Sequence, residues 1–189
     1  KAEDKGVVWL GQDDSLAAVV HSEKAAVLLR GETLKRWCEE GQKKKCTVRT
    51  VSVKVSGVTL IATYMPVRVH GNEMEIEEEK ETLLDHIRWA GEDLMLVGGD
   101  FNAHIGGGEA RGETCGQFGL RQSNEQGEAV LDWCEENGLS WVNSFFRHKR
   151  RGTWFSNIHK QWYEIDGFVM RASQRHKHVR KLKTFGDAM

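Results

Sequence analysis

The segment that most constrains the fold is residues 94–107, LMLVGGDFNAHIGG. Its first four residues are all apolar, so both faces of an extended strand here need cover, as in the central strand of an α/β sheet. Gly98 and Gly99 end the apolar run, and Asp100 and Asn102 follow on either side of Phe101. A covered strand that ends in a carboxylate and a carboxamide predicts a polar site at the edge of a sheet.

The rest of the chain supplies further strands and helices in alternation. Valines alternate with polar residues before the Ser56-Gly57 turn, and a second β-rich run ends before Pro66, which predicts a hairpin over residues 51–64. Apolar spacing with a terminating glycine predicts helices at 73–90 and 125–137. Other strands are expected at 16–21, 25–29, 139–143 and 164–170, and another helix at 33–40.

Length and composition favour a single domain over residues 1–189. The chain is 39% hydrophobic, which is enough for one core. No run approaches the roughly 18 to 20 apolar residues of a membrane-spanning helix, and the start of the chain lacks a signal-peptide pattern. The four cysteines are scattered, without zinc-ligand or disulfide spacing. We therefore expect a monomer in the nucleus or cytoplasm, with no membrane partner.

The charge of the chain is unevenly distributed. The formal net charge is -1, yet residues 147–189 contain eleven Lys/Arg against three Asp/Glu. A basic segment of this kind can face phosphates. It can equally be a solvated surface whose charge is offset by the acidic run between Glu73 and Glu81, and both interpretations stay open.

The D-x-N pattern has two physical interpretations. On a strand, Asp100 and Asn102 would share one face while Phe101 points to the core. A carboxylate beside a neutral amide suits a hard cation, or a water that attacks a phosphate. The alternative is an Asx-type turn, in which the side chains bond local backbone groups. Two other strands carry Tyr64, in TYMP, and Asp166, in WYEIDGFVM, so several strand ends offer polar groups.

Six motifs occur in an order typical of one superfamily. They are ATYMP, GGDFNAHIG, SNEQGEAVLDWCEENGL, VNSFF, GTWFS and EIDGFVM. From about residue 47 to 189 the chain resembles the endonuclease/exonuclease/phosphatase superfamily, and within it most resembles the endonuclease domain of LINE-type (non-LTR) retrotransposons and craniofacial-development-protein-like sequences. The resemblance implies an α/β fold of the DNase-like kind, a four-layered α/β/β/α sandwich.

The resemblance also implies roles for single residues in metal-dependent phosphodiester hydrolysis. Asp100 would orient or deprotonate the attacking water, and Asn102 would hold a non-bridging phosphate oxygen. Tyr64 would contact the phosphate through its hydroxyl, and Asp166 would orient a catalytic histidine. Magnesium or manganese would stabilise the charge that develops on the phosphate.

Two parts of the family pattern are not found in this sequence. The family begins with a strand that carries an Asn and soon reaches a metal-binding Glu, and neither can be placed in residues 1–46. It ends with Ser-Asp-His, whereas this chain ends with Gly-Asp-Ala-Met. We therefore expect a domain truncated at both ends, whose metal ligand is unassigned.

The basic run RHKRR supplies the candidate DNA contacts. Arg147, Lys149, Arg150 and Arg151 are expected to bind the phosphate backbone, and Trp154 next to them to stack on a base, although a tryptophan can equally be a core residue. Asn143 in WVNSFF is expected either to position the phosphate or to cap buried backbone groups. His104 lies near the scissile phosphate or, as a neutral side chain, supports the loop.

Two classes of function remain open. The first is a magnesium-dependent endonuclease that nicks DNA, is derived from a retroelement, and is fused to a reverse transcriptase in its full-length parent; the truncation predicts that this fragment itself is inactive. The second is a remnant of the same fold that binds nucleic acid or protein without hydrolysis. Tyr64, Asp100, Asn102 and Asp166 favour descent from an active enzyme.

Overall fold

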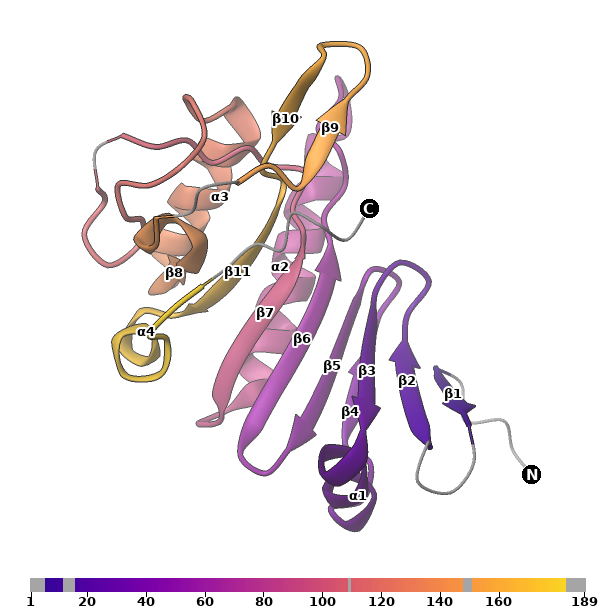
Figure 1. Ribbon diagram of the computed structural model, residues 1–189. Helices are drawn as coiled ribbons and strands as arrows, with labels where there is room; N and C mark the ends of the chain where they lie inside the picture. Colours follow the sequence, from indigo (N-terminus) through magenta and orange to yellow (C-terminus); the bar gives the residue numbers. More distant parts are fainter. Residues whose placement is uncertain (1–5, 12–15, 109, 148–150, 183–189) are drawn as a thin grey trace. The chain divides into compact units, whose positions relative to one another are not determined.

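The computed structural model describes residues 6–11, 16–108, 110–147 and 151–182 (Figure 1). It divides into two compact units, residues 1–99 and 100–189. The organisation as a single domain stays a prediction. Within the described ranges, no helix combines the length and the apolar character needed to cross a bilayer.

The first unit contains two sheets and two helices. One sheet has the antiparallel order β1-β2-β3, and in the other the strands β4, β5, β6 and β7 are neighbours in that order. The elements are β1 (Val7–Leu10), β2 (Ala17–His21), β3 (Ala26–Arg30), α1 (Gly31–Glu39), β4 (Lys44–Cys46), β5 (Thr50–Val55), β6 (Val58–Tyr64), α2 (Glu73–Ala90) and β7 (Leu94–Asp100).

The predicted hairpin over residues 51–64 is confirmed. Strands β5 and β6 pair antiparallel up to Val55 opposite Val58. Ser56 and Gly57 in the turn have φ values of 49° and 73°. Two successive left-handed residues characterise the tight turn whose twist matches that of the strands. The turn therefore fixes the register, and with it the face on which each side chain of β5 lies.

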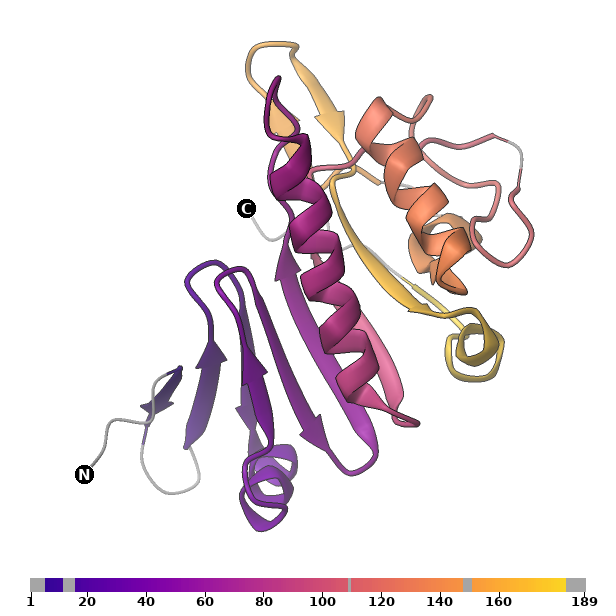
Figure 2. The ribbon, with the colours of Figure 1, turned by 180° about the vertical axis from the view of Figure 1, so that it is seen from behind.

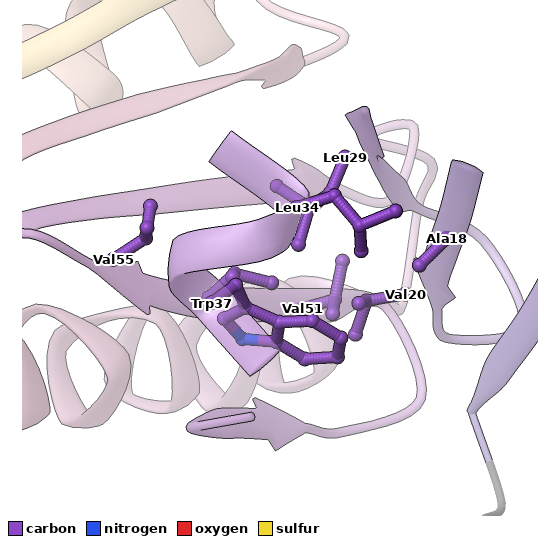
Figure 3. Close-up of a cluster of buried hydrophobic side chains, with 8 residues drawn as sticks. Ala18, Val20, Leu29, Leu34, Trp37, Val51 and Val55 are labelled. Atoms are coloured by element: carbon purple, nitrogen blue, oxygen red, sulfur yellow. The ribbon is translucent and has the colours of Figure 1, made fainter. Parts of the chain in front are cut away.

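One face of β5 packs into the hydrophobic core of the first unit. Val51 and Val55 lie under α1, from which Leu34 and Trp37 point into the same cluster (Figure 3). The Trp37 side chain is fully buried, and its indole nitrogen donates to the carbonyl of Lys43 at 3.2 Å. The remaining members come from the other sheet and β5, namely Ala18, Val20, Leu29 and Val53.

The opposite face of β5 is polar and is covered by α2, which runs along this sheet (Figure 2). Thr50 Oγ1 donates to Glu79 Oε1 at 3.0 Å and lies 2.8 Å from the hydroxyl of Thr63. Ser52 Oγ lies 2.6 Å from His86 Nδ1. Hydrogen bonds thus join the helix and the sheet through a buried polar layer, in which His86 Nε2 has no partner among the described residues.

The second unit has fewer residues in helices and strands than the first. Its elements are α3 (Glu125–Glu136), β8 (Leu139–Trp141), a 3-10 helix (Val142–Phe145), β9 (Trp154–Ser156), β10 (Gln161–Tyr163), β11 (Asp166–Arg171) and α4 (Ala172–His178). Strands β8 and β11 pair antiparallel, and β9 and β10 form a separate two-stranded hairpin. Helix α3 begins after Asn124, whose side chain accepts from the Gly127 N–H at 2.8 Å.

The α/β fold predicted from the sequence is confirmed by this mixture of sheets and helices. The helices expected at 33–40, 73–90 and 125–137 are α1, α2 and α3. One boundary was predicted wrongly, because β8 stops at Trp141 and Asn143 lies in the 3-10 helix rather than at the end of a strand. The short strands β1, β4, β9 and β10 were not predicted.

Candidate active site

Asp100 and Asn102 lie in an Asx-type turn rather than on one face of a strand. Strand β7 ends at Asp100, and Asn102 has a left-handed φ of 46°. Its backbone N–H donates to Asp100 Oδ1 at 2.8 Å. The expected strand geometry is therefore wrong at Asn102, and the alternative of a local turn is correct for Asp100. Phe101 does point inward, edge-to-face against Trp141 with ring centroids 5.0 Å apart.

The glycine before this turn has no room for a side chain. A Cβ on Gly99 would lie 2.0 Å from the carbonyl oxygen of Thr63, a backbone atom of the same unit. Such an approach is possible only for glycine, because real Cβ atoms are not found under 3.0 Å from such atoms. Backbone packing against Thr63 therefore requires a glycine at the second position of the GGDFN motif.

Asp166 is brought next to this turn by backbone hydrogen bonds. The Phe101 N–H donates to the Ile165 carbonyl at 2.9 Å, which joins the turn to the start of β11. Thr153 Oγ1 accepts from the N–H groups of Ile165 and Asp166, at 3.1 and 3.2 Å. The two half-buried carboxylates consequently belong to one site in the second unit.

The electrostatics of the site centre on Asp100. Burial raises the pKa of its carboxyl above the usual value, and the charge of Asp166 raises it further. The hydrogen bond from the Asn102 N–H acts in the opposite direction. A desolvated carboxylate with a raised pKa is a stronger proton acceptor than one in water, which suits a general base.

His104 contributes to the loop through its backbone. Its N–H donates to Asn124 Oδ1 at 3.0 Å, and its carbonyl accepts from the Asn124 N–H at 3.0 Å. The buried ring lies edge-on against Tyr163, with centroids 5.6 Å apart. Neither ring nitrogen has a hydrogen-bond partner among the described residues. The structure thus ties the loop after Asn102 to the start of α3.

The basic run does not form one surface. Arg147 is exposed, whereas Arg151 is only 7% exposed and donates to Glu164 and to three backbone carbonyls. The expectation that Arg151 binds DNA phosphate is wrong, because the guanidinium is buried and occupied. Lys149 and Arg150 lie outside the described residues.

Asn143 is also buried and engaged. Its amide oxygen accepts from the Phe168 N–H at 3.0 Å, and its amide nitrogen donates to Glu164 Oε1 at 3.0 Å. Of the two interpretations of Asn143, the structure shows the buried residue that caps backbone groups. A direct contact from this side chain to DNA is therefore not supported.

Trp154 begins an aromatic hairpin that sequence reasoning did not find. The side chain is 48% exposed and lies near Tyr163, with ring centroids 5.7 Å apart. Phe155 and Trp162 form a second pair at 5.3 Å, and both are exposed. Ile158 in the turn is 87% exposed. Two pairs of adjacent aromatic residues, Trp154-Phe155 and Trp162-Tyr163, on either side of residues 157–160, were the available signal.

Tyr64 belongs to the first unit, where it ends β6. The side chain is half-buried, and the backbone N–H donates to the Arg49 carbonyl at 3.0 Å. Its role stays a prediction from the family pattern.

The described residues do not complete a metal site. Within the described ranges, no three His, Cys, Asp or Glu side chains come together in a cluster that could hold a metal ion. Asp100 and Asp166 offer carboxylate oxygens of the kind that magnesium binds, but magnesium also takes oxygens from water and from substrate phosphates, which the protein does not supply. The residues that would hold the ion therefore stay unassigned.

Comparisons with known proteins support the resemblance. No family model matches the chain. It is 31% identical over 135 residues to craniofacial development protein 2 of Bos taurus, covering 67% of this chain, and 35% identical over 85 residues to that of Tragulus javanicus, covering 44%. The matched stretches span only 22% and 15% of those relatives.

A solved structure supports the fold. A 3'-5' exonuclease of Neisseria meningitidis, NExo, superposes with a TM-score of 0.52 and 16% identity, covering 90% of this chain and 68% of that one. The fold implied by the six motifs is confirmed: the chain has the fold of this exonuclease, and its sequence is similar to that of craniofacial development protein 2.

Proposed function

We propose that the chain carries part of the active site of a phosphodiesterase that nicks DNA. The observation that carries the proposal is the pair of half-buried carboxylates, Asp100 and Asp166, joined through the Phe101–Ile165 hydrogen bond. Desolvation with a like charge nearby raises the pKa of Asp100, an arrangement found more often at functional sites than at structural ones.

Geometry indicates a step for Asp100, and the family resemblance implies the roles of the other residues. Asp100 Oδ1 is anchored by the Asn102 N–H, so Oδ2 is the oxygen that would take a proton from the attacking water. Asn102, next in the turn, would donate its amide to a non-bridging phosphate oxygen. Asp166 would orient a histidine, and Tyr64 would contact the phosphate through its hydroxyl.

DNA would lie against the aromatic hairpin. Trp154, Phe155 and Trp162 expose ring surface on which bases can stack. Arg147, just before the hairpin, would bind a backbone phosphate. A protein of the same fold supports nucleic acid as the ligand: a variant of NExo from Neisseria, a 3' phosphatase, has been solved bound to a product DNA hairpin.

Magnesium or manganese belongs to this proposal as the cofactor that offsets charge on the phosphate in the reaction. Origin from a retroelement, with a reverse transcriptase in the same full-length protein, and residence in the nucleus or cytoplasm also remain part of it. These points come from the family resemblance and require tests of their own.

The test is nicking of supercoiled plasmid with millimolar-scale magnesium or manganese, by this chain and by any longer protein of the same reading frame. Asp100→Asn should retain the fold and lower the rate by about 10² to 10⁴. Asp132→Asn, which removes an exposed carboxylate from α3, is the matched control and should nick at the wild-type rate. Equal nicking by Asp100→Asn and wild type would refute the assignment.

A second candidate function is binding of nucleic acid without hydrolysis. The hairpin favours it, because its rings are presented to solvent whatever the state of the catalytic groups. This candidate would be selected by metal-independent DNA binding that is lost in Trp154→Ala, together with no nicking by this chain or by the longer protein.

A further inference from the structure

A buried polar network lies next to Asp166 in the second unit. Arg151 and Glu164 form an ion pair, Nε to Oε2 at 2.9 Å, and their side chains are 7% and 2% exposed. The amide nitrogen of Asn143, also buried, donates to the other Glu164 oxygen at 3.0 Å. Arg151, Glu164 and Asn143 together form a buried network.

Arg151 connects segments that are distant in sequence. Its Nη1 donates to the Phe146 carbonyl at 2.9 Å, and its Nη2 donates to the carbonyls of Phe118 and Asn143, both at 3.0 Å. Every nitrogen of the guanidinium therefore has a partner. One side chain holds together the long glycine-rich loop, the 3-10 helix and the short segment between β10 and β11 that leads to Asp166.

The Asn143 side chain takes over hydrogen bonds to β11 at the point where pairing between β8 and β11 stops. Strand β8 pairs with β11 only at Val169, Met170 and Arg171 and ends at Trp141. Beyond that point the Asn143 side chain accepts from the Phe168 N–H at 3.0 Å and donates to the Asp166 carbonyl at 3.3 Å. On the edge of β11 that faces β8, the backbone on either side of Gly167 is thus held by one amide side chain instead of a neighbouring strand.

Stability alone gives no reason for a buried ion pair at this position. Apolar side chains of similar size often replace such a pair without loss of stability, because both charges are expensive to remove from water. Asp166 supplies a different reason. Its negative charge acts on Asp100, and two like charges in a partly desolvated site move apart unless the backbone beneath them is fixed.

We infer that Arg151, Glu164 and Asn143 are positioning residues, which fix the backbone of Asp166 so that its carboxylate stays beside Asp100. The catalytic consequence of this inference rests on the proposed function. The placement of Asp166 does not, and it can be measured without any activity.

Amide hydrogen exchange measures the placement directly. In the double variant Arg151→Met with Glu164→Met, the buried charges are removed together, so neither is left unpaired. We expect exchange of the Phe168 amide to rise about tenfold relative to the amides of Val169 to Arg171, which pair with β8. A network that only stabilises the fold would raise exchange at all of these amides by the same factor.

Two further variants complete the exchange experiment. Asn143→Ser removes both bonds to β11 and keeps the ion pair, and it should cause the same selective rise in exchange. It takes the place of the double variant if that variant fails to fold. Arg111→Met removes a more exposed guanidinium that binds Glu128 and Asp132 in the same unit, and it should leave the Phe168 ratio unchanged. An unchanged ratio in folded Asn143→Ser or in the folded double variant would overturn the inference.

Kinetics then tests the catalytic consequence. At a temperature where the variants are folded, the double variant should lower kcat for plasmid nicking by about tenfold or more with KM nearly unchanged, because orientation rather than binding is lost. Glu164→Gln, which keeps an oxygen for one of the two donors and turns an NH2 group toward the other, should have a kcat between those of the double variant and wild type. A selective rise in exchange with unchanged kcat would refute the positioning role. No nicking by the longer wild-type protein would refute the proposed function and leave exchange to decide the placement.

Discussion

Acid should destabilise the first unit through one buried imidazole. His86 on α2 is 0% exposed, and its Nδ1 lies 2.6 Å from the hydroxyl of Ser52. Burial, and to a smaller extent the charge of Lys45, lower the pKa of His86 from 6.5 to about 4, while Asp85 acts in the opposite direction. The imidazole is therefore neutral in the folded protein at neutral pH.

The sign of the effect follows from the protons bound by each state. Between pH 6.5 and 4 the unfolded chain carries a proton on this histidine and the folded chain does not, so the free energy of unfolding falls as the pH falls through this window. With those two pKa values, the free energy of unfolding is about 2 kcal/mol lower at pH 5 than at pH 7.5. Below pH 4 this contribution stays constant.

Urea unfolding at pH 7.5 and at pH 5 measures this difference. Wild type and His70→Gln, which changes an exposed histidine, should both show the loss. His86→Gln should show a loss smaller by about 2 kcal/mol, because glutamine does not titrate. The carboxyl of Glu79, whose pKa is raised by burial, is present in all three proteins and cancels in the comparison.

A direct titration of the ring supplements the unfolding data. The C2 proton of His86 in NMR spectra should keep its neutral chemical shift down to about pH 5. A midpoint near 6.5, or the same pH dependence of unfolding in His86→Gln as in wild type, would refute the reasoning. It would mean that water or rearrangement of α2 solvates the charged ring.

Three further predictions concern DNA binding and packing. Arg147→Ser should reduce the slope of log affinity against log salt by about 0.9 on duplex DNA, whereas Arg151→Ser should lower the free energy of unfolding by about 3–5 kcal/mol instead. Trp154→Ala should weaken single-strand binding in a fluorescence titration by about 1–3 kcal/mol, and Trp9→Ala, at an equally exposed ring in the other unit, should not. Gly99→Ala should lower the melting temperature, since overpacking costs about 1–3 kcal/mol.

The parts of the fold that the sequence predicts are those determined by nearby residues. The β5–β6 hairpin follows from Ser56-Gly57, because this pair adopts the left-handed conformations that a two-residue turn requires. The ends of α2 and α3 follow from local signals too, with Gly91 and Asn124 next to the helices. In each case the decisive atoms lie within a few residues of each other.

The polar layer under α2 depends on distant residues and was not predictable in this way. Alternating polar residues on β5 are typical of a strand with one face in water. Here that face is buried, because Glu79 and His86 on α2 bond Thr50 and Ser52 from 29 and 34 positions along the chain. A pattern in one strand does not show whether a later helix carries matching polar groups.

The same limit explains the division of the basic run. Arg147 and Arg151 look equivalent in RHKRR, and both were expected to bind phosphate. Only the position of Glu164, 13 residues later, makes one of them a buried partner. A charge in a sequence indicates where a counter-charge is needed, but its partner can be a ligand or another part of the chain.

At the D-x-N motif the local backbone geometry determines how the Asp100 carboxylate can act chemically. The spacing of Asp100 and Asn102 fits a strand and an Asx-type turn equally well, and the φ of 46° at Asn102 decides for the turn. Because the Asn102 N–H holds Oδ1, the carboxylate cannot rotate freely, and Oδ2 keeps a fixed direction. The same hydrogen bond opposes the rise in pKa that burial causes, which favours the ionised form that a base needs. The turn therefore agrees with a catalytic role for Asp100, since it orients one oxygen and leaves the other to accept a proton.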